Sequence, residues 1–274
     1  MIWPFFEAWL NTTSLALVAL GLFAIMGATA LLGGLLNRRP AGGEGGQEGF
    51  VISAALGLLA LLIGFTFSMA IERFDARRLL VLEEANAIGT TYLRVQLLPE
   101  PHRARMSDLL VRYTDNRIKL AKTAPGGAMQ RQLLQANDAM ITDVWAATSA
   151  AFDSIKELPF SGPFLDSVNA MIDLDTSRKA ARMARVPTAV FGVLVVFLAS
   201  VSGMFGYELK GGRARGQATL LLALLTLALI LIIDINRPVG GGVIESQAPM
   251  ENLRASFAAW PPEVFDKWRG PGPQ

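Results

Sequence analysis

The sequence contains no cysteine and only one histidine, His102, in 274 residues. The lack of cysteine excludes disulfide bonds, thiol chemistry and cysteine-ligated metal sites. His102 directly follows Pro101 and has no clear partner for catalysis or metal binding. The sequence also lacks a nucleotide-binding glycine loop, an HExxH pattern and a Gly-x-Ser-x-Gly pattern. We therefore expect no enzyme activity, no metal site and no cofactor.

Charged residues are also scarce, at 18% of the chain, whereas hydrophobic residues make up 52%. This composition is too apolar for a soluble globular protein. Basic residues lie mainly at the borders of apolar runs, which argues against a nucleic-acid partner. The uncharged runs are each near the length of a membrane-spanning helix: residues 14–36, 50–70, 187–207 and 217–233. The sequence predicts an all-α membrane protein with four transmembrane helices.

The second of these runs predicts one long helix, from Phe50 to Leu98. No proline interrupts it, and its glycines are mild helix breakers at most. Its first half is uncharged, whereas its second half keeps a helical pattern of apolar residues and adds charges. We expect this helix to leave the membrane and to continue into water without a break.

Further helices are expected after this one, over residues 101–122, 128–157 and 164–185, with proline- or glycine-rich breaks between them. We predict a helical cytosolic bundle that is continuous with spans two and three. The expected organisation has four parts: an interfacial segment with spans one and two (1–71), the cytosolic helical region (72–186), spans three and four (187–236) and an irregular tail that packs on the helical region (237–274).

An even number of spans places both termini and the helical region on one side of the membrane. More basic residues border that side than the other. The first group is Arg73, Arg77, Arg78, Arg178, Lys179, Arg182, Arg185 and Arg237; the second is Arg38, Arg39, Lys210, Arg213 and Arg215. This excess predicts a bacterial inner-membrane protein whose helical region and termini are cytoplasmic.

The spans carry almost no ionisable side chains, which disfavours ion-coupled carriers and proton pumps. A hydrophobically constricted pore or a purely structural membrane protein remains. In the second span, one face carries small residues and the neighbouring face carries large apolar ones: Ser53, Gly57, Ala60, Gly64 and Ser68, then Ile52, Leu56, Leu59, Ile63 and Phe67. The large residues would form apolar rings around a symmetry axis, although ordinary packing or lipid contact also explains them.

Three stretches resemble the bacterial bestrophin-like domain family: residues 63–99, 167–182 and 232–243. The third is IIDINRPVGGGV, in which Asn236 replaces the usual acidic residue and Val239 replaces the usual phenylalanine. The same stretch is distantly similar to the motif that follows the last span of bestrophin anion channels.

This resemblance implies an oligomer, pentameric where bestrophins are known, with an apolar neck lined by the second span. By similarity, Ile63 and Phe67 would form the neck, with Leu59 and Ile71 above and below. The calcium site of animal bestrophins needs an acidic cluster after the last span. Here residues 239–251 supply only Glu245 and Glu251, so we expect no calcium site.

The leading hypothesis is a homo-oligomeric ion channel that passes small anions such as chloride. Arg73, Arg77 and Arg78 would form an inner vestibule that raises the local anion concentration. One alternative is a non-conducting oligomeric scaffold or sensor that binds a partner protein. Another is a cation-selective channel, because acidic residues follow the second span: Glu72, Asp75, Glu83 and Glu84.

Overall fold

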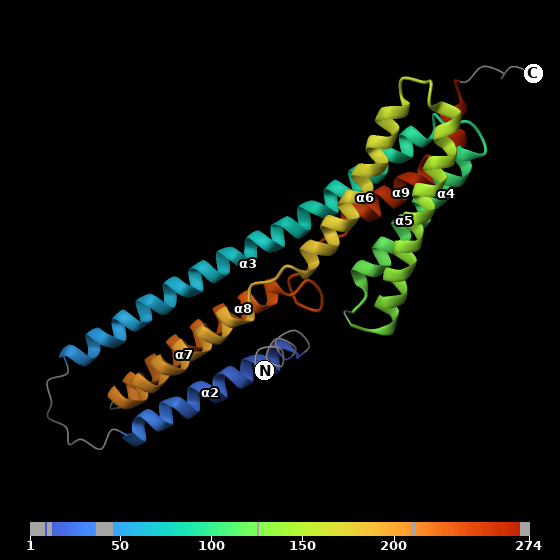
Figure 1. Cartoon of the computed structure of the whole chain (residues 1–274). Coiled ribbons are helices and arrows are strands. Elements are labelled where there is room, and N and C mark those ends of the chain that lie inside the picture. The colour runs from blue at the N-terminus through green and yellow to red at the C-terminus, as the bar shows by residue number, and fades with distance from the viewer. Residues whose placement is uncertain (1–8, 10–12, 37–45, 125, 210–211, 269–274) are drawn as a thin grey trace, which may run out of the picture. The chain divides into compact units, whose positions relative to one another are not determined.

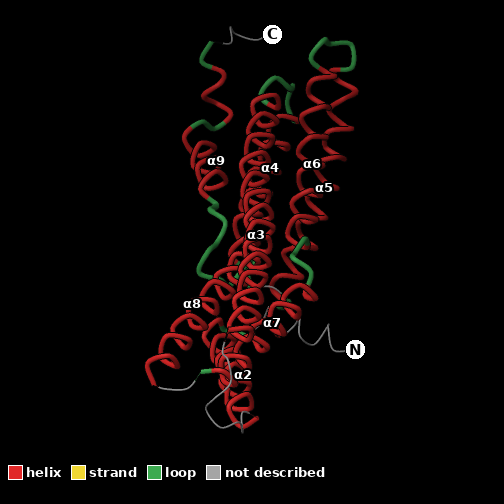
Figure 2. The backbone as a smooth tube through the Cα atoms, turned by 90° about the vertical axis from the view of Figure 1, so that its left-hand side faces the viewer, coloured by secondary structure: helices red, strands yellow, loops and turns green. Residues whose placement is uncertain are grey.

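The computed structural model describes residues 9, 13–36, 46–124, 126–209 and 212–268 (Figures 1 and 2). These residues form helices joined by short loops, and no strand occurs among them. Most of the expected interfacial segment, together with Arg38, Arg39 and Lys210, lies outside the described residues. The helices are α2 (Leu15–Leu36), α3 (Gly46–Val95), α4 (His102–Lys122), α5 (Ala128–Ile155), α6 (Ser161–Met183), α7 (Thr188–Glu208), α8 (Gly212–Asn236) and α9 (Ala248–Ala259), followed by the 3-10 helix η1 (Pro262–Asp266).

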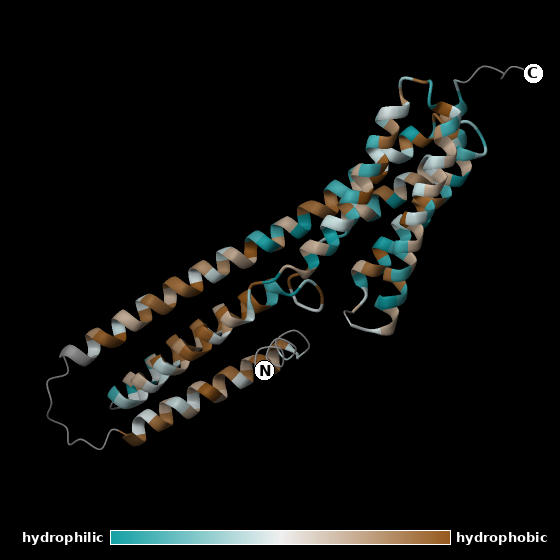
Figure 3. Cartoon of the chain, in the orientation of Figure 1, coloured by the Kyte–Doolittle hydropathy of each residue, from teal (hydrophilic) through white to brown (hydrophobic). Residues whose placement is uncertain are grey.

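Four helical segments are long and apolar enough to cross a bilayer, as predicted. They are α2, the first half of α3, α7 and α8 (Figure 3). The expected long helix is present, since α3 runs for 50 residues without interruption. The protein is therefore an all-α integral membrane protein.

The chain divides into two compact units. The membrane unit comprises Met1–Phe74 and Arg185–Val243, and the second unit comprises Asp75–Ala184 and Ile244–Gln274. The α3 helix contributes residues to both units, because the division falls between Phe74 and Asp75 within it.

Glycines bring α2 and α7 of the membrane unit into close contact. A Cβ atom added at Gly33 of α2 would overlap the backbone oxygen of Gly203. On α7, a Cβ atom added at Gly206 would overlap the backbone oxygen of Ala30. Small residues at helix interfaces allow such close approach in membranes. The apolar core beside this contact includes Leu22 and Leu194, which are almost fully buried.

The second unit has its own apolar core, which includes Ile88 of α3, Leu110 of α4 and Phe164 of α6. The expectation of an irregular tail is wrong in one respect, because residues 248–259 form the helix α9. Phe257 of α9 is buried, and its ring centroid lies 4.3 Å from that of Tyr92.

The predicted continuity of the third span with the preceding helix is interrupted. Helix α6 ends at Met183 and α7 begins at Thr188, with a non-helical stretch from Ala184 to Pro187 between them. Proline lacks a backbone N–H and disfavours helical geometry in the residue before it, so the break falls at Val186-Pro187.

Candidate functional site

The membrane-spanning half of α3 has one side that its own membrane unit leaves uncovered. The predicted small-residue face is exposed along its whole length, at Ser53, Gly57, Ala60, Gly64 and Ser68. The opposite side is buried, with Leu59 1%, Thr66 3% and Ala70 0% exposed. This asymmetry separates a packing side of α3 from an open, uncharged side.

The four predicted neck residues differ in their placement. Phe67 is 39% exposed, whereas Leu59 lies in the apolar core of the membrane unit. Ile63 and Ile71 are half-buried and pack against that core. Phe67 is thus the large apolar side chain of this set that α3 presents outward, and the neck itself remains a prediction.

The three arginines predicted to form an inner vestibule also differ in their exposure. Arg77 is buried, and its Nε donates a hydrogen bond to Glu245 Oε1 at 2.5 Å. Its charge is therefore balanced inside the second unit. Arg78 is exposed and Arg73 is half-buried. Arg78 follows Phe67 by eleven residues, which is about three helical turns, so the two share one face of α3.

The acidic residues that left the cation-channel alternative open are not equivalent either. Glu72, Asp75 and Glu83 are exposed, whereas Glu84 is completely buried. Glu84 is bound by Arg117 and Arg178 of its own unit and is removed from any surface that an ion could reach.

A buried polar network surrounds Glu84 in the second unit. Its carboxylate accepts hydrogen bonds from the Tyr113 hydroxyl at 2.7 Å, from Arg117 Nη2 at 3.0 Å and from Arg178 Nη1. Asp175 pairs with Arg117 Nη1 at 3.0 Å and accepts a hydrogen bond from Asn137 at 2.9 Å. The network joins α3, α4 and α6 through charged groups and α5 through the amide of Asn137.

The sequence alone does not predict this buried cluster, because the charges are spread over separate helices. The sequence offers only a weak signal for burial, such as Tyr113 one helical turn before Arg117. Burial, followed by the nearby Glu84 carboxylate, raises the pKa of Tyr113 well above its usual value.

The motif at the end of the last span, residues 232–243, makes several hydrogen bonds within the membrane unit. Asp234 accepts hydrogen bonds from the backbone N–H groups of Gly242 at 2.7 Å and Val243 at 3.0 Å. The intervening Gly240 has φ +85°, a conformation that favours glycine. The side chain of Asn236 accepts a hydrogen bond from the Val186 N–H at 2.9 Å. Asn236 therefore connects the end of α8 to the loop that precedes α7.

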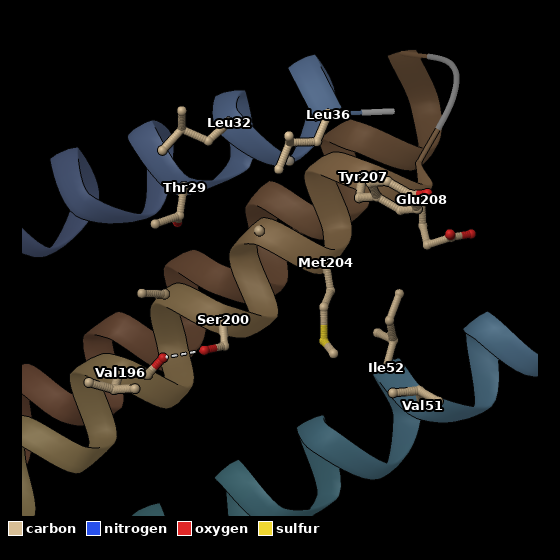
Figure 4. Close-up of a pocket in the computed structure, with 13 residues that line it drawn as sticks. Thr29, Leu32, Leu36, Val51, Ile52, Val196, Ser200, Met204, Tyr207 and Glu208 are labelled. Carbon is tan, nitrogen blue, oxygen red and sulfur yellow. Dashed lines mark hydrogen bonds between the residues drawn. The ribbon is translucent and has the colours of Figure 1, made fainter. Parts of the chain in front are cut away.

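A cavity of about 640 Å³ lies in the membrane unit between α2, α7 and the beginning of α3 (Figure 4). Met204 and Ile52 face each other across it in Figure 4. The Ser200 hydroxyl at its wall donates to the Val196 carbonyl at 2.8 Å, within its own helix. The walls are mostly apolar, and we do not assign this cavity to an ion path.

No group of three or more histidine or acidic side chains within the described ranges is placed to hold a metal ion. Glu245 and Glu251, the two acids of residues 239–251, each pair with a basic residue. Their partners are Arg77 and Lys122 respectively.

Comparison with known proteins identifies the family. A family model described as the Bestrophin-like domain matches residues 15–249. A search of curated proteins gave no significant match. A mutant crystal structure of a bacterial bestrophin homolog from Klebsiella pneumoniae is 14% identical with a TM-score of 0.67, and the alignment covers 90% of this chain and 97% of that one. Another structure of the homolog is 15% identical with a TM-score of 0.64, over 87% and 96% of the two chains. The chain belongs to the Bestrophin-like domain family.

Proposed function

We propose that this protein is a homo-oligomeric channel for small anions such as chloride, with α3 helices from several copies arranged around the conducting axis. The observation that carries the proposal is the open, uncharged side of α3. It presents Phe67 among small residues, while the opposite side packs into the membrane unit. A ring of Phe67 side chains would form a hydrophobic constriction, which conducts or closes by wetting and dewetting.

The other neck residues take supporting positions in this proposal. Ile63 lies one helical turn before Phe67 and would form the edge of the constriction, with Ile71 one turn after it. Leu59 would hold α3 against the rest of its own membrane unit, because its side chain is 1% exposed and lies in the apolar core of that unit.

Anion selectivity is supported by the charge that shares a face with Phe67. Arg78 is exposed and lies on that face, about three turns further along α3. A ring of Arg78 side chains would raise the local concentration of anions at the inner mouth. Arg73 would add to this potential, whereas Arg77 is left out of the vestibule because Glu245 neutralises it.

We further propose that the assembly is a pentamer in the bacterial inner membrane, with the second unit in the cytoplasm. The family supports the pentamer, and the excess of basic residues next to the second unit supports the orientation. Neither a resident metal nor a nucleic acid is part of this proposal.

Chloride flux from liposomes tests conduction. Liposomes with the purified protein should release chloride faster than empty liposomes, and Phe67→Ala should change the rate. Leu231→Ala is the matched control, because Leu231 is an exposed apolar residue on α8. Equal release from loaded and empty liposomes would refute the channel and favour a non-conducting scaffold or sensor.

Reversal potentials under a potassium chloride gradient test selectivity. The reversal potential of the parent protein should lie between zero and the equilibrium potential of chloride. Arg78→Glu should shift this reversal potential toward the equilibrium potential of potassium. A potassium-selective parent would refute the anion proposal and support a path controlled by Glu72 and Asp75.

A further inference from the structure

A second cavity lies in the second unit, and none of its lining residues belongs to α3. It has a volume of about 340 Å³ and is lined by residues of α4, α5 and α6. Sites for small organic molecules commonly have volumes of about 300–1,000 Å³. Its lining combines cations with apolar side chains, including Arg178, Lys179, Arg182, Leu120, Leu134 and Met183.

Most of the cations at this cavity are already neutralised. Arg178 pairs with Glu84, and Arg117 pairs with both Glu84 and Asp175, at 2.9 and 3.0 Å. Lys179 pairs with Asp138 at 2.6 Å and with Asp175 at 2.7 Å. These three basic residues are matched by the same number of carboxylates.

Arg182 is the exception. Among the residues that the structure describes, no carboxylate lies within 4.0 Å of its guanidinium group, and its buried Nε atom has no hydrogen-bond partner. Burial, followed by the nearby charge of Arg178, lowers the pKa of Arg182 to about 10. The group is still protonated at neutral pH, so the cavity holds one surplus positive charge.

A partly buried cation without a partner is unfavourable, and a bound anion would relieve that cost through charge-assisted hydrogen bonds. The surplus of one charge matches a single acidic group. The apolar walls at Leu120, Leu134 and Met183 match an uncharged organic body, which a chloride ion does not have.

We propose that this cavity binds a small organic anion, whose single acidic group pairs with Arg182 and whose apolar part packs against Leu120, Leu134 and Met183. Gln130 lies at the same cavity and its Oε1 accepts a hydrogen bond from the Gly126 N–H at 2.6 Å. Its side-chain amide would provide a further polar contact. This site is independent of whether α3 lines a channel.

Calorimetric titration of the full-length protein in detergent tests the proposal, with 3-phenylpropionate as the probe. The uncharged 3-phenylpropionamide has nearly the same shape and serves as the matched compound. We expect saturable binding of the carboxylate and at least about tenfold weaker binding of the amide. Equal affinity for the two compounds, or no saturable binding of the carboxylate up to about 10 mM, would overturn the proposal.

Substitutions at the cavity test whether the probe binds there. Arg182→Gln should weaken 3-phenylpropionate binding at least about tenfold, whereas Arg105→Gln, which removes an exposed arginine of the same unit, should not. Gln130→Glu keeps the acceptor for Gly126 but adds a negative charge, and should also weaken binding. Unchanged affinity in Arg182→Gln would overturn the assignment.

The melting temperature without probe distinguishes a variant that has lost the binding site from a variant that has lost its fold. Because Arg182→Gln removes an unfavourable charge, its melting temperature without probe should equal or exceed that of the parent protein. Loss of binding together with a lowered melting temperature in both Arg182→Gln and Gln130→Glu would contradict a binding role and indicate a structural one.

Discussion

Glu84 of α3 and Arg178 of α6 form an ion pair in the interior of the second unit, although 94 residues separate them in the sequence. Both side chains are almost completely buried. The same carboxylate also binds Tyr113 and Arg117 of α4. One acidic group therefore fixes the positions of α3, α4 and α6 in this unit.

Glu84→Gln should strongly destabilise the protein. It leaves Arg117 and Arg178 buried with one charged partner fewer, and removing one partner of a buried pair typically costs about 3–5 kcal/mol. Thermal or denaturant unfolding in detergent measures the change. The control is Glu251→Gln, whose pair with Lys122 is exposed and should contribute about 1 kcal/mol or less. Similar effects of the two substitutions would contradict the proposed role of Glu84.

Alkaline pH should destabilise the chain through Tyr113. Its pKa in the folded chain is raised above the ordinary value of 10.0, so the phenol ionises first in the unfolded chain. This difference stabilises the folded state below pH 10 and is progressively lost as the pH rises toward the folded pKa. The free energy of unfolding, measured between about pH 8 and pH 11, should fall less steeply in Tyr113→Phe. An unchanged pH slope would contradict burial of this phenol.

Structure that extends over many residues could be predicted from the sequence only where it belongs to a single helix. The unbroken apolar and then charged pattern from Phe50 predicts α3 well, because helical periodicity and the absence of proline are local properties. The Glu84–Arg178 pair could not be predicted, since a charged residue on a helix has the same local pattern whether it is solvated or buried. Helix α9 could not be predicted from the sequence pattern, because it is short and has Pro249 as its second residue.

In the candidate site, too, local features could be predicted from the sequence, whereas contacts between distant residues could not. The small-residue face of α3 could be predicted from residue spacing, and it is exposed as a continuous strip. The different positions of Arg77 and Arg78 could not, because they depend on Glu245, which lies 168 residues after Arg77. Likewise, the isolation of Arg182 depends on how three other helical carboxylates are already paired.

Gly33→Ala should destabilise the membrane unit. The added methyl group would overlap the backbone of α7 at Gly203, and overpacking of this kind costs about 1–3 kcal/mol. Gly27→Ala is the control on the same helix, because a Cβ atom there has nothing within 4 Å. It should leave stability unchanged or raise it slightly through helix propensity. Equal melting temperatures for the two variants would argue against the close α2–α7 contact.

Substitutions of Asp234 should form a graded series. Asp234→Asn keeps one carbonyl oxygen, which can accept from the N–H of Gly242 or of Val243 but does not replace both carboxylate oxygens. Asp234→Ala removes both acceptors. Each lost hydrogen bond should cost about 1 kcal/mol, so melting temperature should fall in the order Asp, Asn, Ala. A stability of the alanine variant equal to that of the parent would show that the loop does not depend on this carboxylate.

The most direct test of a conducting path along α3 uses the natural absence of cysteine. Phe67→Cys introduces the only thiol of the chain, which a charged, membrane-impermeant thiosulfonate reagent can reach from water but not from lipid. Leu231→Cys is the matched control on the exposed side of α8. We predict that the reagent modifies Phe67→Cys and changes its chloride flux, and that it leaves the flux of Leu231→Cys unchanged. A Phe67→Cys protein that is fully modified, as judged by mass spectrometry, yet conducts chloride at its original rate would rule out a conducting path past Phe67.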